Sequence, residues 1–400
     1  MRLADFGNSP TPALLVYERA KVPHATLETN RTCDLGCRLC YNLDHASTKT
    51  LEEVKAELDA LAKKRKLQAV SLLGGEPTLH PDLAEIIAHV KRRGALCQLL
   101  TNGRRLLADG DGSYLVSLIR AGLDRVQVHI DQGQAAAYGN IEAARRKVFA
   151  MLEARKVHFG LSVTIYNADR GQLASLAREY SRYGYFDGIL AILAREPMPP
   201  STQDVRLEEE FEGLRLGLGI APSAFIPSNE SRDDVRWLLY LYFINPADGT
   251  ALAISPTLDK ILRRVYRLAT GREVFIIILP PALARPALAL AAAVECFLHP
   301  ASTPRILGSV LRSLGRGTRF QYIAVQDPPQ FDERTGRMLI CQNCPDATIR
   351  NGRVTPVCLA DRMNPLPAYG PPTEESRVWS PAVFRHLEGE GVETRDAVTY

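Results

Sequence analysis

Short apolar segments alternate with helical patterns through the first half of the chain. Apolar residues recur at helical spacing in the stretch that contains Leu51, Val54, Leu58 and Leu61. The same spacing predicts helices around 83–90, 115–119, 148–152 and 173–180. Between these helices lie segments with the length and composition of strands, at 24–30, 68–73, 95–101, 124–130, 157–165 and 186–193. Strands that alternate with crossover helices imply a parallel sheet with helices outside it.

Three of the predicted strands also alternate between polar and apolar residues. The polar members are Glu28 in the first strand, Gln127 and His129 in the fourth, and Ser162 and Thr164 in the fifth. Because side chains alternate between the faces of a strand, one face of the sheet should be apolar and the other polar. A closed barrel fills its interior with branched apolar side chains. We therefore predict an α/β fold whose six strands form an open, partial barrel around a polar ligand.

The pattern weakens beyond residue 200. Segments 196–204 and 221–234 are typical of loops, and 235–268 contains apolar segments around a turn at Asn245–Gly249. The long apolar stretch 274–299 could span a bilayer by length. Prolines, Arg285 and Glu295 interrupt it, so we expect a buried strand followed by a buried helix.

The sequence pattern also indicates where the domains of the chain begin and end. The Pro-rich, charged residues 365–400 hold one predicted helix near 380–390. The expected units are an N-terminal extension (1–23), the partial barrel (24–200), an apolar helical region (201–340), a metal-binding region (341–370) and a tail (371–400).

Composition narrows the class of protein. The 400 residues are 46% hydrophobic and 24% charged, as in ordinary soluble globular proteins. A net charge of +4 gives no strong case for nucleic acid or an acidic membrane as partner. The first residues lack the apolar run of a secretion signal, so we expect a cytoplasmic protein.

Six of the eight cysteines fall in two tight groups, which in a cytosolic protein favours metal binding. The remaining two, Cys97 and Cys296, are expected to be small buried apolar residues. The first group, Cys33, Cys37 and Cys40, has the spacing C-x3-C-x2-C directly after the first strand. Three thiolates can hold a four-iron cluster and leave one iron open. Zinc is the alternative and would need a fourth ligand, such as Asp34 or His45.

A glycine pair follows the second strand in the segment SLLGGEPTLHP at 71–81. Gly74 and Gly75 allow a ligand to approach the backbone closely. Glu76 can accept hydrogen bonds from an ammonium group, and Pro77 stiffens the turn. An ordinary strand-to-helix turn is the alternative explanation for such a segment.

Together, the three cysteines and the following GGEP resemble the radical S-adenosylmethionine (SAM) superfamily. LLTNGR at 99–104, which contains Asn102, and GLDRVQVHID at 122–131 resemble its third and fourth strands. The likeness covers about residues 24–194. One small departure is Leu39, where the family often has an aromatic residue, with Tyr41 following the last cysteine.

This resemblance implies a cofactor and a reaction. Cys33, Cys37 and Cys40 would ligate a [4Fe–4S] cluster whose open iron binds the amino and carboxylate groups of SAM. Reduction of the cluster, by a donor such as flavodoxin or ferredoxin, would cleave SAM to a 5′-deoxyadenosyl radical that abstracts hydrogen from the substrate. The barrel would position the cofactor and exclude water.

The resemblance also assigns residues to SAM. Gly74, Gly75 and Glu76 would hold the amino group, and Pro77 and Asn102 are also expected to bind the cofactor. His129 and Asp131 are placed for the ribose or the substrate, with a structural hydrogen bond as the alternative for His129. Ser162, Thr164 and Asn167 are placed for the carboxylate or adenine side. No residue is identified for a catalytic role of its own.

The second cysteine group, Cys341, Cys344 and Cys358, has the spacing C-x2-C-x13-C. Gly352 lies between its members, as in a hairpin that presents cysteines from both arms. A second iron–sulfur cluster and a zinc that only fastens the region both remain open. Cys296, His299 or Asp346 could complete either site.

This region, with PVCLADRMNP after it, weakly resembles tetraether synthases and hydroxymethylpterin-methyltransferase-like radical SAM proteins. The apolar stretches of 235–299 could be extra core, or a wall that admits an aliphatic chain at the barrel mouth. We therefore predict a hydrophobic or lipid-like substrate that undergoes C–C bond formation or alkylation. The alternatives are a ribosomal peptide, a small polar metabolite, or a non-catalytic electron carrier; an RNA substrate is disfavoured because acids balance the basic residues.

Overall fold

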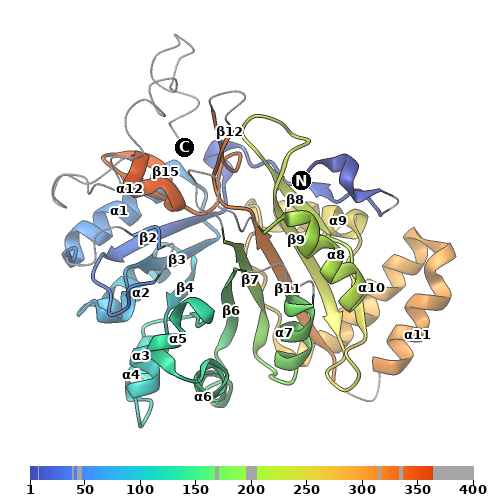
Figure 1. Cartoon of the computed structure of the whole chain (residues 1–400), viewed down its shortest axis with the longest axis horizontal. Coiled ribbons are helices and arrows are strands. Elements are labelled where there is room, and N and C mark those ends of the chain that lie inside the picture. Colours follow the sequence, from blue (N-terminus) through green and yellow to red (C-terminus); the bar gives the residue numbers. More distant parts are fainter. Residues whose placement is uncertain are drawn as a thin grey trace.

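One large sheet, with helices packed outside it, forms the body of the molecule (Figure 1). The computed structural model describes residues 1–7, 9–37, 40–42, 47–166, 171–194, 205–313, 317–332 and 337–363. The predicted helix near 380–390 and the candidate residues His45 and Asn167 lie outside these ranges.

Six parallel strands form the half of the sheet that the sequence pattern predicts. They lie side by side in the order β7-β6-β5-β4-β3-β2. Their bounds match the predicted ones within a residue: β2 (His24–Asn30), β3 (Ala69–Gly74), β4 (Leu96–Thr101), β5 (Arg125–His129), β6 (His158–Ile165) and β7 (Phe186–Leu193). The α/β fold with an open, partial barrel is confirmed, because the sheet ends at free edges and does not close.

Helices cover the outer face of these strands. The first, α1 (Leu51–Lys64), begins after Thr50. The Thr50 hydroxyl accepts from the Glu53 amide, and the Glu53 carboxylate accepts from the Thr50 amide, so the two residues form a capping box. The other helices of this half are α2 (Leu83–Arg92), α3 (Arg104–Ala108), α4 (Ser113–Arg120), α5 (Ala135–Tyr138), α6 (Ile141–Ala154), α7 (Gln172–Tyr180) and α8 (Leu207–Leu218). The predicted helical segments are therefore confirmed.

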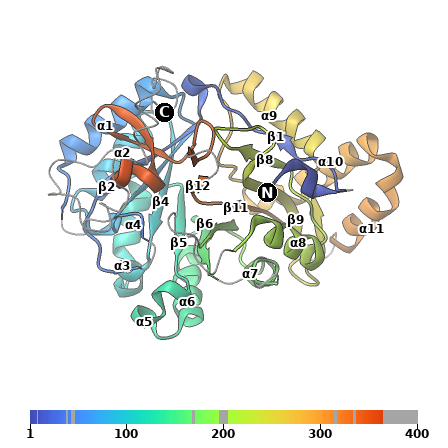
Figure 2. The same cartoon turned by 45° about the horizontal axis from the view of Figure 1, so that its top comes forward.

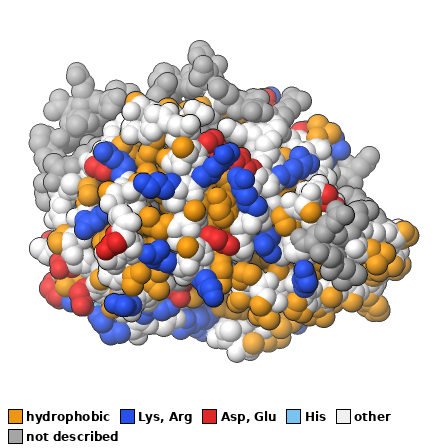
Figure 3. Space-filling view, turned by 90° about the horizontal axis from the view of Figure 1, so that it is seen from below, with side chains coloured by type: hydrophobic (Ala, Val, Ile, Leu, Met, Phe, Trp, Pro, Cys, Tyr) orange, Lys and Arg blue, Asp and Glu red, His pale blue; other side chains and the backbone are white. Residues whose placement is uncertain are grey.

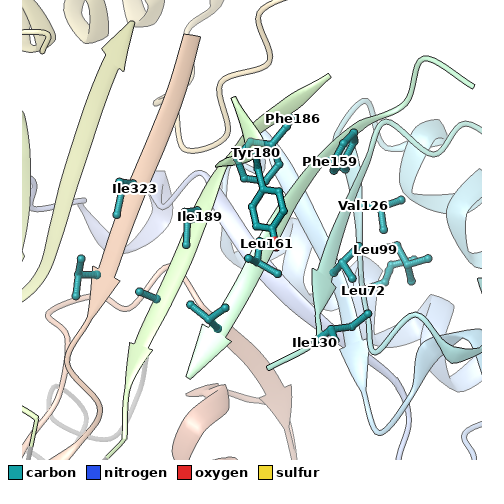
Figure 4. Close-up of a cluster of buried hydrophobic side chains, with 14 of the residues drawn as sticks. Leu72, Leu99, Val126, Ile130, Phe159, Leu161, Tyr180, Phe186, Ile189 and Ile323 are labelled. Atoms are coloured by element: carbon teal, nitrogen blue, oxygen red, sulfur yellow. The ribbon is translucent and has the colours of Figure 1, made fainter. Parts of the chain in front are cut away.

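The apolar face of the sheet packs beneath these helices. Figure 4 shows Leu72, Leu99, Val126 and Leu161 from neighbouring strands in one cluster, with aromatic side chains above them. All four side chains are fully buried. As the alternation in the sequence predicted, the apolar residues pack against the helices. The polar residues of the same strands lie on the inner face of the sheet.

The sheet continues beyond β7, which the sequence pattern does not predict. Strand β11 (Arg319–Gln326) pairs with β7 in parallel, and β9 (Val235–Ile244) pairs with β11 in antiparallel orientation. Next to β9 lie β8 (Ala224–Pro227), β10 (Ala251–Ala253) and, paired with β8, β1 (Ala13–Leu14) from the expected N-terminal extension. Region 201–340, expected to be helical, therefore contributes four strands to the same sheet.

Residues 274–299 differ from the prediction. Residues 274–280 form an extended segment outside the sheet rather than a buried strand. Helix α10 (Ala284–Leu298) is present but is only partly buried, with one face packed against α9 (Pro256–Thr270), α11 (Thr303–Ser313) and β11. Cys296, on α10, is half-buried rather than buried, whereas Cys97 is buried as expected. Pro281–Leu298 is the one described helical stretch with the length and hydropathy of a membrane span.

Short hairpins follow β11 near the carboxyl end. Strands β14 (Ala347–Arg350) and β15 (Arg353–Pro356) pair through a turn in which Asn351 and Gly352 both have positive φ, as a two-residue hairpin turn requires. Figure 2 shows this hairpin and α12 (Ala360–Met363) beside β2 and α1. The other hairpin and the 3-10 helices are β12 (Gln330–Asp332), β13 (Arg337–Leu339), η1 (Leu3–Phe6), η2 (Arg19–Lys21), η3 (Pro77–Leu79), η4 (Gln132–Gln134), η5 (Pro281–Leu283), η6 (Pro300–Ser302) and η7 (Val357–Leu359).

Candidate active site between two groups of cysteines

A cavity of about 410 Å³ lies on the polar face of the sheet. All three cysteines of the first group line it, and so does Cys358 of the second group. The remaining predicted site residues on its wall are Gly74, Gly75, Glu76, Asn102, His129, Asp131, Ser162 and Thr164. The structure thus gathers residues from the ends of β2 to β6 around one space, as parallel strands do at their carboxyl edge.

The loop that carries the first cysteine group is fastened on both sides. Before the loop, the amides of Arg31 and Thr32 donate to the Ser47 carbonyl at 2.7 and 2.9 Å. Within it, the Asp34 carboxylate accepts from Asn102 Nδ2 at 2.7 Å, and Arg104 donates to the Asp34 carbonyl at 2.8 Å. Asn102, predicted as a cofactor-binding residue, therefore holds the cysteine loop in place.

The three cysteines of the first group are half-buried in the cavity wall. Burial raises the pKa of Cys33 and that of Cys40 to about 11 each. Burial also raises the pKa of Cys37, against a hydrogen bond that Gln134 Nε2 donates to its sulfur at 3.5 Å. A metal deprotonates such thiols on binding. Three soft sulfur donors on one cavity wall are the donor set that iron–sulfur clusters use.

Gly74 and Gly75 are required by their neighbours in the protein. Gly74 has φ of 144°, and a Cβ atom there would lie 2.0 Å from the Asn30 carbonyl oxygen. A Cβ atom on Gly75 would lie 2.2 Å from the Thr32 carbonyl oxygen. The glycine pair therefore lets the end of β3 press against the backbone that leads into the cysteine loop. Tyr41 strengthens this contact by donating to the Gly74 carbonyl at 2.8 Å.

Glu76 is buried at the wall of the cavity and joins three segments. Its Oε1 accepts from the amide and hydroxyl of Thr78 and from the Thr101 hydroxyl, and its Oε2 accepts from the Asn102 amide. Burial raises the pKa of its carboxyl, against these hydrogen bonds, which lower it. A carboxylate offers about four acceptor positions, so Oε2 keeps capacity for a further donor. Pro77, next in sequence and predicted to bind the cofactor, begins η3 and does not line the cavity.

Asp131 organises the ends of β5 and β6. Its Oδ2 accepts from the Thr164 amide at 2.7 Å and lies 2.8 Å from His129 Nε2, and its Oδ1 accepts from the Gly133 amide. Burial acts to raise the pKa of Asp131, but the His129 imidazole and the Thr164 amide hold it below its ordinary value. Both interpretations of His129 are thus compatible with its position, since it is hydrogen-bonded and also faces the cavity.

Several cavity residues have no signal in the sequence. Gln134 and Tyr41 act on the first cysteine group or its support, yet neither belongs to a motif used above. On the floor of the cavity, the buried Arg125 guanidinium pairs with Asp187 and donates from Nη2 to the Tyr322 hydroxyl at 2.8 Å. These contacts join strands far apart in the chain, so no local pattern could reveal them.

The second cysteine group forms a buried cluster of thiols. Cys341 and Cys344 are buried, and the Trp237 indole donates to Cys341 Sγ at 2.9 Å. The Cys344 thiol donates a hydrogen bond to Cys341, and this bond and burial both raise the pKa of Cys344 far above its ordinary value, with the nearby Cys358 and Asp346 adding to the rise. The predicted hairpin is confirmed, since Cys344 precedes β14 and Cys358 follows β15.

The other proposed ligands of this site separate into near and remote residues. Asp346 acts on the pKa of both Cys344 and Cys358 and lies 3.0 Å from His24 Nδ1. Cys296 and His299 belong to α10 and its end, and His299 lies beside Glu295. Among the described residues, no three His, Cys, Asp or Glu side chains stand close enough to share a single metal ion.

The two cysteine groups lie at opposite ends of β2. Arg65 donates to the carbonyls of His24, Cys344 and Pro345, which fixes the second group at the start of this strand. The first group follows Asn30 at the end of the same strand. A seven-residue strand spans about 20 Å, and residues at or just beyond both ends of β2, including His24 and Cys33, line the cavity.

A buried ion network links the supports of the two groups. Glu28 of β2 accepts a hydrogen bond from Arg31 at 2.6 Å. Each of its two carboxylate oxygens also accepts a hydrogen bond from Arg350 of β14, at 2.7 Å. Arg31 and Arg350 both also pair with Asp361, in α12. Arg31 stands two residues before Cys33, and Asp361 stands three residues after Cys358. The polar residue Glu28, predicted on the inner face, thus anchors the carboxyl-terminal hairpin.

Residues 27–194 match the family model described as the radical SAM superfamily. A PqqA peptide cyclase from Methylorubrum populi is 32% identical over 170 residues, which are 40% of this chain and 42% of the relative. A PqqA peptide cyclase from Streptomyces rochei is 32% identical over 169 residues, 38% of this chain and 43% of the relative. The chain therefore spans less than half the length of the curated relatives it matches.

Solved structures also match part of the chain. Streptococcus suis SuiB bound to the precursor peptide SuiA is 14% identical with a TM-score of 0.37, covering 43% of this chain and 40% of that one. Native anSMEcpe with bound AdoMet is 15% identical with a TM-score of 0.37, covering 48% of this chain and 59% of that one. The resemblance to tetraether synthases stays a prediction, because the relatives named here are peptide cyclases.

Proposed function

The chain carries a radical SAM domain over residues 27–194, and from this premise we propose that it is a radical SAM enzyme. The enzyme uses two metal centres to modify a ribosomally made peptide. Cys33, Cys37 and Cys40 hold the [4Fe–4S] cluster, and Gly74, Gly75 and Glu76 receive the amino group of SAM. When bound, the cluster and SAM supply a carbon-centred radical that can remove hydrogen from an unactivated C–H bond.

The residues around the cavity prepare the site for that chemistry. Asn102 and Arg104 hold the cysteine loop through Asp34, and Tyr41 ties its end to Gly74. Asp131, kept ionised by its partners, orients His129 and the end of β6 for the ribose and carboxylate of SAM. The first cysteine group is half-buried, which reduces the contact of the thiols with water and oxygen.

One observation carries the proposal: a single cavity is lined by the first cysteine group and by Cys358 of the second. A zinc that only fastened the carboxyl-terminal region would have no need to face this cavity. We therefore propose a second iron–sulfur cluster on Cys341, Cys344 and Cys358, with Asp346 as the nearest candidate for a further ligand. An electron donor such as flavodoxin or ferredoxin would serve these clusters in the cytoplasm.

Peptide modification is favoured over the lipid-like substrate that the sequence suggested. The matched relatives are named as peptide cyclases, although they match only over the radical SAM domain. A lipid-like substrate stays the second candidate, because Phe275, Ile276 and Ile277 give the cavity an apolar wall next to Trp237 and Leu239. The same wall would also accept an apolar side chain of a peptide.

The substrate class can be tested by 5′-deoxyadenosine formation under anaerobic, reducing conditions. The probes are peptides encoded by short reading frames next to the gene and, in a parallel series, detergent-solubilised lipid extract of the native cell. We expect a peptide to raise the rate well above the substrate-free rate and to lose the mass of two hydrogen atoms. Stimulation by the lipid extract alone would contradict the peptide proposal and favour the second candidate.

The second centre has its own test. Replacing Cys341, Cys344 and Cys358 by alanine should remove roughly half of the bound iron, because each group holds one cluster. The remaining iron should show the visible spectrum of a four-iron cluster, and the variant should still cleave SAM. Zinc at this position in the wild-type protein, or unchanged iron in the variant, would contradict a second cluster.

A further inference from the structure

The helices α9, α10 and α11 expose an apolar surface that covers nothing in the described part of this chain. Nine of the eleven large hydrophobic residues that are exposed in the described ranges lie between Pro256 and Ser313. We call these nine the apolar surface: Ile261, Leu262, Val265, Leu268, Leu283, Leu290, Phe297, Leu307 and Leu311. Figure 3 shows hydrophobic side chains gathered on the side where Figure 1 places α10 and α11. Soluble proteins rarely keep so many large apolar residues together in water without a partner.

The exposed residues follow helical periodicity, so they form continuous stripes. On α9, Ile261, Val265 and Leu268 recur at the spacing of one helix face. Leu290 and Phe297 are two turns apart on α10 and are 67% and 83% exposed. Helix α10 packs against both α9 and α11, so the three helices that carry these stripes form one group at the surface.

The charges that accompany the apolar surface have one sign. The exposed charged residues among the described side chains of these helices are Lys260, Arg264, Arg267 and Arg285, of which Arg267 pairs with Glu273 just after α9. The acidic residues of the same helices are buried. Asp259 pairs with Arg263, and Glu295 accepts a hydrogen bond from the Ser255 amide. Such a surface matches an anionic lipid bilayer. Its leucine and phenylalanine side chains can insert among the acyl chains, and its lysine and arginine side chains can bind the anionic headgroups.

We propose that α9, α10 and α11 dock this enzyme on an anionic lipid bilayer, with the helices in the plane of the interface. The stretch Pro281–Leu298, which includes α10, has the length of a membrane span, but the Glu295 side chain accepts from the Ser255 amide at the start of α9, and α10 packs on β11. It therefore belongs to the body of the protein and does not cross the bilayer. The segment after α9 reaches the cavity wall at Phe275, so docking would bring this wall close to the lipid.

Sedimentation with sucrose-loaded vesicles tests this proposal on the full chain. The vesicles contain phosphatidylcholine alone or equal parts of phosphatidylcholine and phosphatidylglycerol. We expect the wild-type protein to sediment with the anionic vesicles, and high salt to weaken this binding. The variant Leu290→Gln/Phe297→Gln/Leu311→Gln should lower the partition coefficient at least about tenfold, because it removes three apolar anchors.

Matched variants separate lipid docking from a change in folding. Lys260→Glu/Arg264→Glu should weaken binding to anionic vesicles about tenfold or more while changing little with phosphatidylcholine alone. Leu216→Gln, at an exposed leucine of α8 outside the apolar surface, should bind like the wild type. Unfolding curves should coincide for all variants, since the replaced side chains are exposed.

Three outcomes would overturn the proposal. The first is a wild-type protein that sediments with neither kind of vesicle, and the second is a triple variant that sediments as well as Leu216→Gln. The third is a dimer, seen by size-exclusion chromatography, that the triple variant converts to a monomer, which would assign the surface to a second copy of the chain. The assay uses neither SAM nor substrate, so its result is independent of the proposed function.

Discussion

At the scale of single residues, Gly74 is the most constrained position of the site. Its φ of 144° and the Asn30 carbonyl 2.0 Å from an added Cβ leave no room for a side chain. We expect Gly74→Ala to lower the free energy of unfolding by about 2–4 kcal/mol, because the strain and the clash both act on the backbone. Gly110→Ala is the matched control, since an added Cβ there meets nothing within 4 Å. Equal urea midpoints for the two variants would contradict this role of Gly74.

Trp237 is the residue that touches the second cysteine group most directly. Its indole N–H donates to Cys341 Sγ, and such hydrogen bonds stabilise the more negative, reduced form of a cluster. Trp237→Phe keeps the aromatic ring and removes the donor. We expect the reduction potential of the proposed second cluster to fall by roughly 50 mV or more, measured by redox titration. The first cluster serves as the internal control; an unchanged potential of the second would show that this hydrogen bond is not made to a cluster ligand.

At the scale of elements, the contact between β14 and β2 depends on one buried charge pair. Arg350→Met should lower the free energy of unfolding by about 3–5 kcal/mol, because it leaves Glu28 buried with fewer partners. Glu28→Met/Arg350→Met should recover much of that loss, since neither charge then remains. Chemical denaturation of the single and double variants measures the coupling. Additive losses in the double variant would show that the pair does not hold the hairpin.

The same pair predicts a dependence of stability on pH. Burial acts to raise the pKa of Glu28, but Arg350, Lys49 and Arg31 hold it below the ordinary value of 4.5. The stabilisation is therefore complete above about pH 4.5 and is lost as the pH falls through the lowered pKa. We expect the unfolding free energy of Glu28→Gln to change less with pH below 4.5 than that of the wild type. Parallel slopes for the two proteins would contradict this.

The elements of the first half could be predicted from the sequence, whereas in the second half only helix α10 and the hairpin of β14 and β15 could be. Strands β2 to β7 alternate with helices that show a clear apolar stripe, so each element has a local signal. Strand β11 pairs with β7 although more than a hundred residues separate them, and no local pattern records that pairing. The stretch 274–280 reads as a strand because it is apolar, yet it lines the cavity instead of joining the sheet.

At the scale of the whole molecule, the sequence identified residues that line the first part of the cavity, but it did not predict how far the cavity extends. The motifs identified the residues that line the first part of the cavity, because cysteines and glycines at fixed spacing are local features. The position of Cys358 on the same cavity follows from the packing of the carboxyl-terminal hairpin along β2. The links through Arg65 and Arg350 to β2 join residues about three hundred positions apart, which spacing alone cannot reveal.

Cleavage of SAM tests the central claim most directly. The wild-type protein, the variant with Cys33, Cys37 and Cys40 replaced by alanine, and the variant with Cys341, Cys344 and Cys358 replaced by alanine are each reduced anaerobically with SAM. The account predicts 5′-deoxyadenosine from the wild type and from the second variant, and none above background from the first. Formation of 5′-deoxyadenosine by the first variant at the wild-type rate would contradict it.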